Sequence, residues 1–169
     1  VYSFETAQSL SKVASKLGKV AKIHLKIDTG MGRVGFTPEN ASDAAEIISK
    51  LPNLEIEGIF THFAVADEYS EKSNAYTREQ YAKFYEVCEK IRQEKHINIP
   101  IRHAANSAAI LRYPEMHLDM VRAGIILYGL WPSEETKITG ADLKAVMTLK
   151  SAVSYVKEVE SGACLSYGC

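Results

Sequence analysis

The stretch from Val20 to Gly35, VAKIHLKIDTGMGRVG, decides the fold class. Its first half, Val20–Ile27, is rich in apolar residues and alternates in polarity, which is typical of a buried strand. Three glycines within the next eight residues permit a tight turn. Thr37 and Pro38 follow, and a hydroxyl residue before proline signals a helix start. The stretch therefore predicts a strand, a loop and a helix in succession.

The same succession repeats along the chain. Apolar residues recur at helical spacing from Ser3, a candidate N-cap, to Leu17, and Gly18 ends this helix. Three further apolar runs are interpreted as strands: Ile56–Phe63, Ile99–Ala104 and Met120–Tyr128. Tyr2 is interpreted as the tail of a fifth, preceding strand. Because strands that alternate with helices form parallel βαβ units, we expect an α/β fold, either an open sheet or a (β/α)8 barrel.

The pattern changes after Pro132. A loop over residues 132–140 leads to Val146–Val159, which alternates in polarity and has no helix behind it. Such a segment favours an antiparallel strand. We therefore expect the α/β part, an open sheet or a partial barrel, over residues 1–135 and the beginning of a β-rich domain over residues 136–169.

Composition limits the class of protein. The chain has 169 residues, is 46% hydrophobic, and carries a net charge of −1, which argues against disorder and against a nucleic-acid-binding surface. No apolar run is long enough to span a bilayer, and no secretory signal is recognised. Three cysteines without a close pair favour a reducing, cytoplasmic compartment. A first residue other than Met suggests a piece of a longer protein.

Polar residues follow the expected strands, at the sheet edge that lines active sites in such folds. They are Asp28, His62, Asn106 and Arg122. The glycine-rich loop would also bring Lys26 and Arg33 toward the same region. That loop could cradle a phosphate, although it lacks the P-loop spacing, or it could be a structural turn with a solvated arginine.

The individual polar residues leave alternatives open. His62, His103 and Asp67 lack metal-ligand spacing, so we expect no metal site, and a lone histidine is often structural. Ser107 could cap a short helix or hold a phosphate. Arg122 lies within an apolar run, and burying it is costly unless it is paired. Arg122 is therefore a functional candidate.

Four segments in register carry a resemblance to a known family. They are HLKIDTGMGRVGF, GIFTHFAVADE, RHAANSAAILRYPE and DMVRAGIILYGLWPS, and SAVSYVKEVESGACLSYG continues the match. Together they resemble the bacterial alanine racemases. The resemblance implies an isomerase dependent on pyridoxal 5′-phosphate (PLP), with a (β/α)8 barrel followed by a β domain. It also implies a homodimer that acts on a small amino acid, and about the last five barrel strands in this chain.

The resemblance assigns roles to individual residues. Arg122 would bond the pyridine nitrogen of PLP, with His62 beside it. Ser107, Gly124 and Ile125 would bind the cofactor phosphate, supported by Asn106 and His103. Arg33 would contact the substrate carboxylate and the phenolic oxygen of PLP. Lys26 matches the lysine that is carbamylated in many members and holds that arginine.

Tyr167 matches the catalytic tyrosine, which acts across the dimer interface. The implied reaction interconverts L-alanine and D-alanine through a PLP aldimine by two-base proton transfer, and supplies D-alanine for peptidoglycan. The second base is the PLP-bearing lysine, whose Lys-Ala-Asn-Ala-Tyr-Gly type of motif does not occur in these 169 residues. We therefore expect this chain alone to be inactive.

Two other interpretations remain. The first is a serine or broad-specificity racemase of the same fold. The second is a non-catalytic PLP-binding barrel. The presence of Arg33, Arg122 and Tyr167 together argues against the second, because a protein that only binds PLP does not need the tyrosine.

Overall fold

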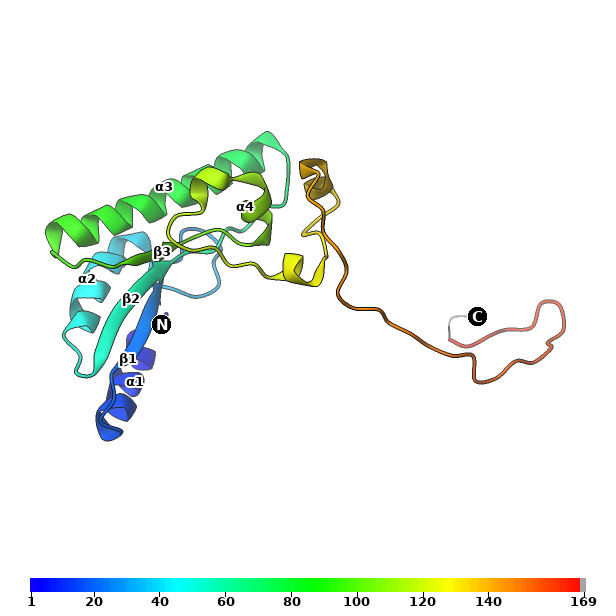
Figure 1. Cartoon of the computed structure of the whole chain (residues 1–169), viewed down its shortest axis with the longest axis horizontal. Helices are drawn as coiled ribbons and strands as arrows, with labels where there is room; N and C mark the ends of the chain where they lie inside the picture. The colour runs from blue at the N-terminus through cyan, green and yellow to red at the C-terminus, as the bar shows by residue number, and fades with distance from the viewer. Residues whose placement is uncertain (168–169) are drawn as a thin grey trace.

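The computed structural model describes residues 1–167 and has an α/β architecture (Figure 1). A parallel sheet contains its three strands in the order β1-β2-β3. The strands are β1 (Ala21–Lys26), β2 (Leu54–Phe60) and β3 (Ile101–His103), and the α-helices are α1 (Phe4–Lys16), α2 (Pro38–Ser49), α3 (Glu71–Glu94) and α4 (Ser107–Arg112). Short 3-10 helices are η1 (Pro114–Met116), η2 (Ile125–Tyr128) and η3 (Glu135–Thr139). The expected alternation of strand and helix is therefore confirmed over the first two thirds of the chain.

Local signals fix the helix ends. The Ser3 hydroxyl accepts a hydrogen bond from the Thr6 amide at the start of α1, and Gly18 adopts a left-handed φ of 62° just after its end. Thr37 is the N-cap of α2, but its hydroxyl makes no capping hydrogen bond. The expected start at Pro38 is nevertheless correct, because the proline ring fixes the first helical φ.

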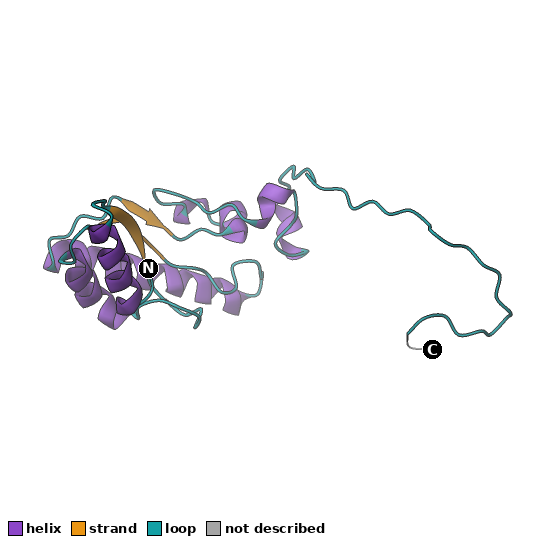
Figure 2. Ribbon diagram, turned by 90° about the horizontal axis from the view of Figure 1, so that it is seen from below, coloured by secondary structure: helices purple, strands orange, loops and turns teal. Residues whose placement is uncertain are grey.

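The helices α1, α2 and α3 lie on one side of the sheet (Figure 2). The core lies between this helical layer and the strand residues Ile23, Leu25 and Ile59. The helices contribute small and branched apolar side chains: Ala7, Ala41, Ala44, Ala45, Ile48, Phe84 and Ile91. Alanines allow the helices to approach the sheet closely. This packing leaves the opposite, concave face of the sheet to polar side chains.

The β1–β2 pairing contains a bulge. Ile23 lies opposite Ile56, but His24 lies opposite Gly58, so Glu57 is an extra residue on β2. From there the register continues, with Lys26 opposite Phe60 and Phe60 opposite His103. His24, Lys26 and His103 therefore share the concave face.

Val1, rather than Tyr2, lies at the free edge of β1. Its ammonium group donates to His24 O over 2.7 Å, and its carbonyl accepts from the Lys26 amide over 2.8 Å. These two bonds have the pattern of a parallel bridge.

The structure corrects the expected fourth strand at Met120–Tyr128, and with it the expected count of about five. Residues 120–124 have no regular structure, and Ile125–Tyr128 forms η2. The segment reaches the edge beyond β3 through two bonds, from the Asp119 amide to Arg102 O and from the Arg122 amide to Ala105 O. An apolar run alone does not make a strand, because a strand also needs a neighbour along its length. Closure into a barrel stays a prediction.

The expected strand at Val146–Val159 is also wrong. This segment is exposed, has no regular structure and extends away from the body of the molecule (Figure 1). Its alternating pattern could be satisfied only against a second strand, and no such strand lies beside it in residues 1–167. The division into two domains stays a prediction.

Candidate functional site

Arg122 is the centre of a hydrogen-bonded cluster at the carboxyl ends of β2 and β3. Its NH2 donates to Thr61 O over 2.8 Å and to Ala104 O over 3.1 Å. Its NH1 lies 2.8 Å from His103 Nδ1, and its NH2 lies 3.3 Å from His62 Nδ1. The structure thus brings together three residues singled out from the sequence: Arg122, His62 and His103.

Every one of these partners is neutral. Within residues 1–167, Arg122 forms no ion pair with a carboxylate. Burial lowers the pKa of Arg122 to about 10, so the guanidinium stays charged at neutral pH. Burial, followed by the Arg122 charge, lowers the pKa of both His62 and His103 to about 4, so both imidazoles are neutral there. The site therefore holds a positive charge that no neighbouring carboxylate neutralises, and this charge attracts electron-rich groups.

Ser107 and Gly124 meet beside this cluster. The Gly124 amide donates to Ser107 Oγ over 2.9 Å. A Cβ atom at Gly124 would lie 3.4 Å from the same oxygen, so glycine keeps the space in front of Ser107 open. Ile125 follows as the first residue of η2 and is 42% exposed.

Asn106, rather than Ser107, caps the short helix α4. Its Oδ1 accepts from the Ala109 amide over 3.1 Å, and its amide nitrogen donates to Phe63 O over 3.4 Å. The capping role considered for Ser107 is therefore wrong, since the Ser107 hydroxyl is directed to Gly124.

Lys26 is buried on the concave face, 4% exposed. Its Nζ donates to Ile27 O over 2.8 Å and lies 5.7 Å from the centre of the Phe60 ring, the ring that Arg122 also approaches. Burial lowers its pKa to about 8, with the charges of Arg122 and Arg33 contributing to this value and the charge of Asp28 opposing it. Lys26 is therefore an amine with an accessible neutral form near physiological pH.

The glycine-rich loop is organised by its own first residue. Asp28 Oδ1 accepts from the amides of Gly30, Met31 and Gly32 over 3.1, 2.9 and 3.0 Å. Because these amides already bind a carboxylate, they are not available to cradle a phosphate. These hydrogen bonds favour the structural turn over a phosphate cradle for this loop. Arg33 is exposed, and its charge influences both Lys26 and His62.

Tyr167 lies far from the cluster. It is fully exposed and belongs to the C-terminal segment, which extends away from the packed body (Figure 1). Gly168, the last residue of the Ser166-Tyr167-Gly168 motif, and Cys169, the third cysteine of the sequence, lie outside the described residues.

Sequence reasoning missed His24. Its Nδ1 lies 2.7 Å from His103 Nε2, which makes His24 part of the cluster around Arg122. The signal was available, because His24 occupies the same face of its strand as Lys26, two residues later. Nothing in the sequence, however, placed β3 within reach of it.

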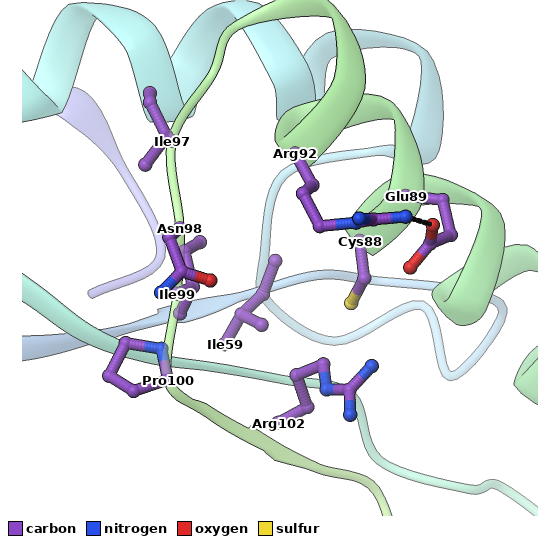
Figure 3. A pocket seen from close by; sticks show the side chains of 9 residues that line it. All are labelled: Ile59, Cys88, Glu89, Arg92, Ile97, Asn98, Ile99, Pro100 and Arg102. Atoms are coloured by element: carbon purple, nitrogen blue, oxygen red, sulfur yellow. Dashed lines mark hydrogen bonds and ion pairs between the residues drawn. The ribbon is translucent and has the colours of Figure 1, made fainter.

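A cavity of about 420 Å3, away from the Arg122 cluster, lies between α3 and the residues that lead into β3 (Figure 3). Burial raises the pKa of its Cys88 thiol to about 12, which makes the thiol unreactive at neutral pH. Arg92 pairs with Glu89, and Arg102 pairs with Asp119 over 2.9 Å. The cavity therefore offers no free reactive group.

Residues 1–167 contain neither a candidate membrane span nor a candidate metal cluster. No helix there has the length and apolar character needed to cross a membrane. No group of three or more His, Cys, Asp or Glu side chains in this part of the chain could hold a metal ion.

Comparisons with known proteins agree with each other. The family model for the alanine racemase N-terminal domain matches residues 1–132. The alanine racemase of Clostridium tetani is 52% identical over 99% of this chain, and that of Methanococcus maripaludis is 51% identical over 100%. The match covers 43% and 44% of those proteins, so the chain spans less than half of their length.

Solved structures give the same result. The alanine racemase of Clostridium difficile 630 superposes with a TM-score of 0.85 at 44% identity, over 99% of this chain and 43% of that chain. The enzyme of Bacillus anthracis, solved with bound L-Ala-P, superposes with a TM-score of 0.83 at 33% identity, over 99% of this chain and 42% of that one.

Proposed function

The chain belongs to the alanine racemase family, and from this premise we propose that the intact protein interconverts L-alanine and D-alanine with PLP as its cofactor. Its product would supply D-alanine for peptidoglycan in the cytoplasm, and the active form would be a homodimer. The observation that carries the proposal is the charged Arg122, which is surrounded by neutral partners at the sheet edge.

The residues present fit PLP. A pyridine nitrogen is a neutral acceptor, like the partners that Arg122 already has, and Arg122 would donate to it. Ser107 and the Gly124 amide, joined over 2.9 Å with open space in front, offer a hydroxyl and a nearby backbone turn for a phosphate. Ile125 and Asn106 complete this wall. PLP supplies an electron-accepting ring that acidifies the α-hydrogen of a bound amino acid.

Arg122 would control how strongly that ring accepts electrons. A guanidinium that stays charged cannot take the role of a carboxylate, which would stabilise a protonated pyridine nitrogen. Arg122 would therefore keep the nitrogen unprotonated. His62 and His103 support this role because both are neutral and accept from the guanidinium.

Lys26 suits the carbamylation expected of it. Carbon dioxide reacts with a neutral amine, and the lowered pKa of Lys26, about 8, supplies one near neutral pH. A carbamate would convert this cation into an anion able to hold the exposed Arg33. Arg33 would then be positioned for the substrate carboxylate.

Tyr167 would act as one of the two proton-transferring bases, in the active site of the partner subunit. Its exposure at the end of an extended segment is compatible with such a reach. The PLP-bearing lysine would serve the opposite face of the substrate. Since no lysine here lies in the expected motif, we propose that the 169-residue chain alone has no racemase activity.

The test is to measure conversion of L-alanine and L-serine by the intact protein with added PLP, beside its Tyr167→Phe variant. We expect fast alanine turnover, slow serine turnover and a loss of at least about 100-fold in the variant. Dominant serine turnover would favour a serine or broad-specificity racemase. Absence of both would favour a non-catalytic PLP-binding barrel.

The 169-residue chain has its own test. It is incubated with PLP, reduced with borohydride and digested for mass analysis. We expect no specific lysine to carry the label. A single stoichiometrically labelled lysine would overturn the proposed inactivity of this chain.

A further inference from the structure

A chain of side chains connects the exposed end of the concave face to Arg122. Arg122 NH1 lies 2.8 Å from His103 Nδ1, and His103 Nε2 lies 2.7 Å from His24 Nδ1. His24 Nε2 lies 3.6 Å from a carboxylate oxygen of Glu57, which is an electrostatic contact. Lys22 in turn donates to Glu57 over 2.7 Å. The chain thus runs from the amino end of the strands toward the candidate site.

The contact with Arg122 shows which tautomers this series of hydrogen bonds requires. A guanidinium can only donate, so His103 Nδ1 must accept and the His103 proton must lie on Nε2. That proton points to His24 Nδ1, which must also accept. The His24 proton therefore lies on Nε2 and faces the Glu57 carboxylate. Each ring has a single compatible tautomer.

Two features of the fold are explained by this chain. The bulge in β2 adds Glu57 as an extra residue, which places its side chain on the same face as His24. Gly58 follows, and a Cβ atom there would lie 2.4 Å from His24 Nδ1. Gly58 has no left-handed φ, so its backbone does not require glycine. The space that Gly58 leaves is occupied by the His24 ring.

We propose that Glu57 and His24 are positioning residues for Arg122, and that Glu57 selects the His24 tautomer that lets His103 accept from the guanidinium. If the His24 proton moved to Nδ1, two N–H groups would face each other across 2.7 Å. One ring would have to turn, and Arg122 would lose its shortest imidazole contact. The proposal rests on the proposed function only in assigning Arg122 to the cofactor.

Nuclear magnetic resonance of the histidine ring nitrogens tests the proposed tautomers, and it needs no cofactor. At pH 7, long-range proton–nitrogen spectra of the 169-residue chain should show Nδ1 unprotonated and Nε2 protonated in both His24 and His103. The Glu57→Gln variant should shift His24 toward the Nδ1-protonated form and change the His103 signals.

Glu55→Gln is the matched control, because Glu55 lies on the same strand and within 3.9 Å of Lys22 but has no contact with His24. It should leave both rings unchanged. His24→Asn, which keeps an acceptor near the Nδ1 position, should preserve the His103 tautomer, whereas His24→Leu should not. A protonated Nδ1 in wild-type His103, or identical spectra for Glu57→Gln and wild type, would overturn the proposal.

Activity of the intact protein provides a second readout. Glu57→Gln should lower kcat about tenfold with little change in KM, whereas Glu55→Gln should match wild type. If the tautomers are as predicted but neither the wild type nor any variant has racemase activity, the proposed function is refuted and the positioning of His103 by Glu57 and His24 is still supported. An active enzyme whose kcat is indifferent to Glu57→Gln would refute the positioning role and leave the function standing.

Discussion

At the scale of single residues, the charge of Arg122 governs its surroundings. A charged group in a half-buried site is tolerated when hydrogen bonds replace its hydration, and here backbone carbonyls and imidazoles do so. Burial, with the Arg122 charge as a second cause, lowers the pKa of the neighbouring histidines and keeps them neutral. This arrangement should lower the free energy of unfolding in acid, because the unfolded chain binds protons that the buried histidines do not.

The free energy of unfolding should fall as the pH is lowered from 7 to 5. The pKa of His103 is about 4 in the folded chain and about 6.5 when unfolded, so the unfolded state binds more protons in this window. His103→Gln should reduce the pH-dependent loss by on the order of 1 kcal/mol, measured by urea unfolding. His96→Asn, at an exposed position with a φ of 55°, is the control and should keep the wild-type slope. An unchanged slope in His103→Gln would contradict the prediction.

Which site residues could be foreseen depended on their local signal. Arg122 stood out because it interrupts an apolar run, and Asn106 and His62 stood out because they end strands. His24 shares a strand face with Lys26, but its importance comes from His103, which is 79 residues away along the chain. Contacts of this kind depend on strand order and register.

At the scale of elements, local signals succeeded where an element is stabilised by its own sequence and the helical layer. The strands β1 and β2 and the helices α1, α2 and α3 all meet that condition. Met120–Tyr128 and Val146–Val159 have equally good strand patterns. Met120–Tyr128, however, meets the edge beyond β3 only through isolated backbone bonds, and Val146–Val159 has no strand beside it in residues 1–167. The bulge at Glu57 could not be predicted either, because it exists only in relation to β1.

Gly58→Ala should destabilise the sheet by about 1–3 kcal/mol, because the new methyl group collides with the His24 ring at 2.4 Å. Urea unfolding measures the change. In the background of His24→Ala, the same glycine substitution should cost less than about 1 kcal/mol, since the ring is absent. Equal costs in both backgrounds would show that the glycine serves the backbone instead.

Arg112 on α4 contacts both the loop between β2 and α3 and the first turn of α3, and so stabilises the loop conformation. Its guanidinium donates to Ala66 O over 2.6 Å and to Asn74 Oδ1 over 2.7 Å, and it lies 3.6 Å above the Tyr69 ring. Arg112→Lys should cost about 1–2 kcal/mol, because an ammonium group cannot make these planar contacts together. Hydrogen exchange of the loop amides should accelerate.

Arg78→Lys is the control for this substitution. Arg78 pairs with Glu115 over 3.1 Å at an exposed position. The change should cost less than about 0.5 kcal/mol, because exposed ion pairs contribute little. A similar cost for the two arginines would contradict the special role of Arg112.

At the scale of the whole molecule, the chain divides into a packed body and an exposed C-terminal segment (Figure 1). The last backbone contact between them is the bond from the Val146 amide to Tyr128 O, over 3.3 Å. Beyond it, large apolar side chains such as Leu149 and Val153 are 100% and 81% exposed. Because this segment is exposed and has no regular structure, a protease should cleave it before the packed body.

Brief trypsin treatment should therefore cut after Lys150 and Lys157 before any site in the body. Arg33 is the informative comparison, because it is exposed on a loop that the Asp28 carboxylate holds in place. Mass analysis identifies the order of the cuts, and Lys150→Gln should leave Lys157 as the first site. The trimmed body should keep its free energy of unfolding within about 0.5 kcal/mol, because the removed segment contributes no core contacts. Cleavage at Arg33 first, or a larger loss of stability, would show that the segment packs against the body in solution.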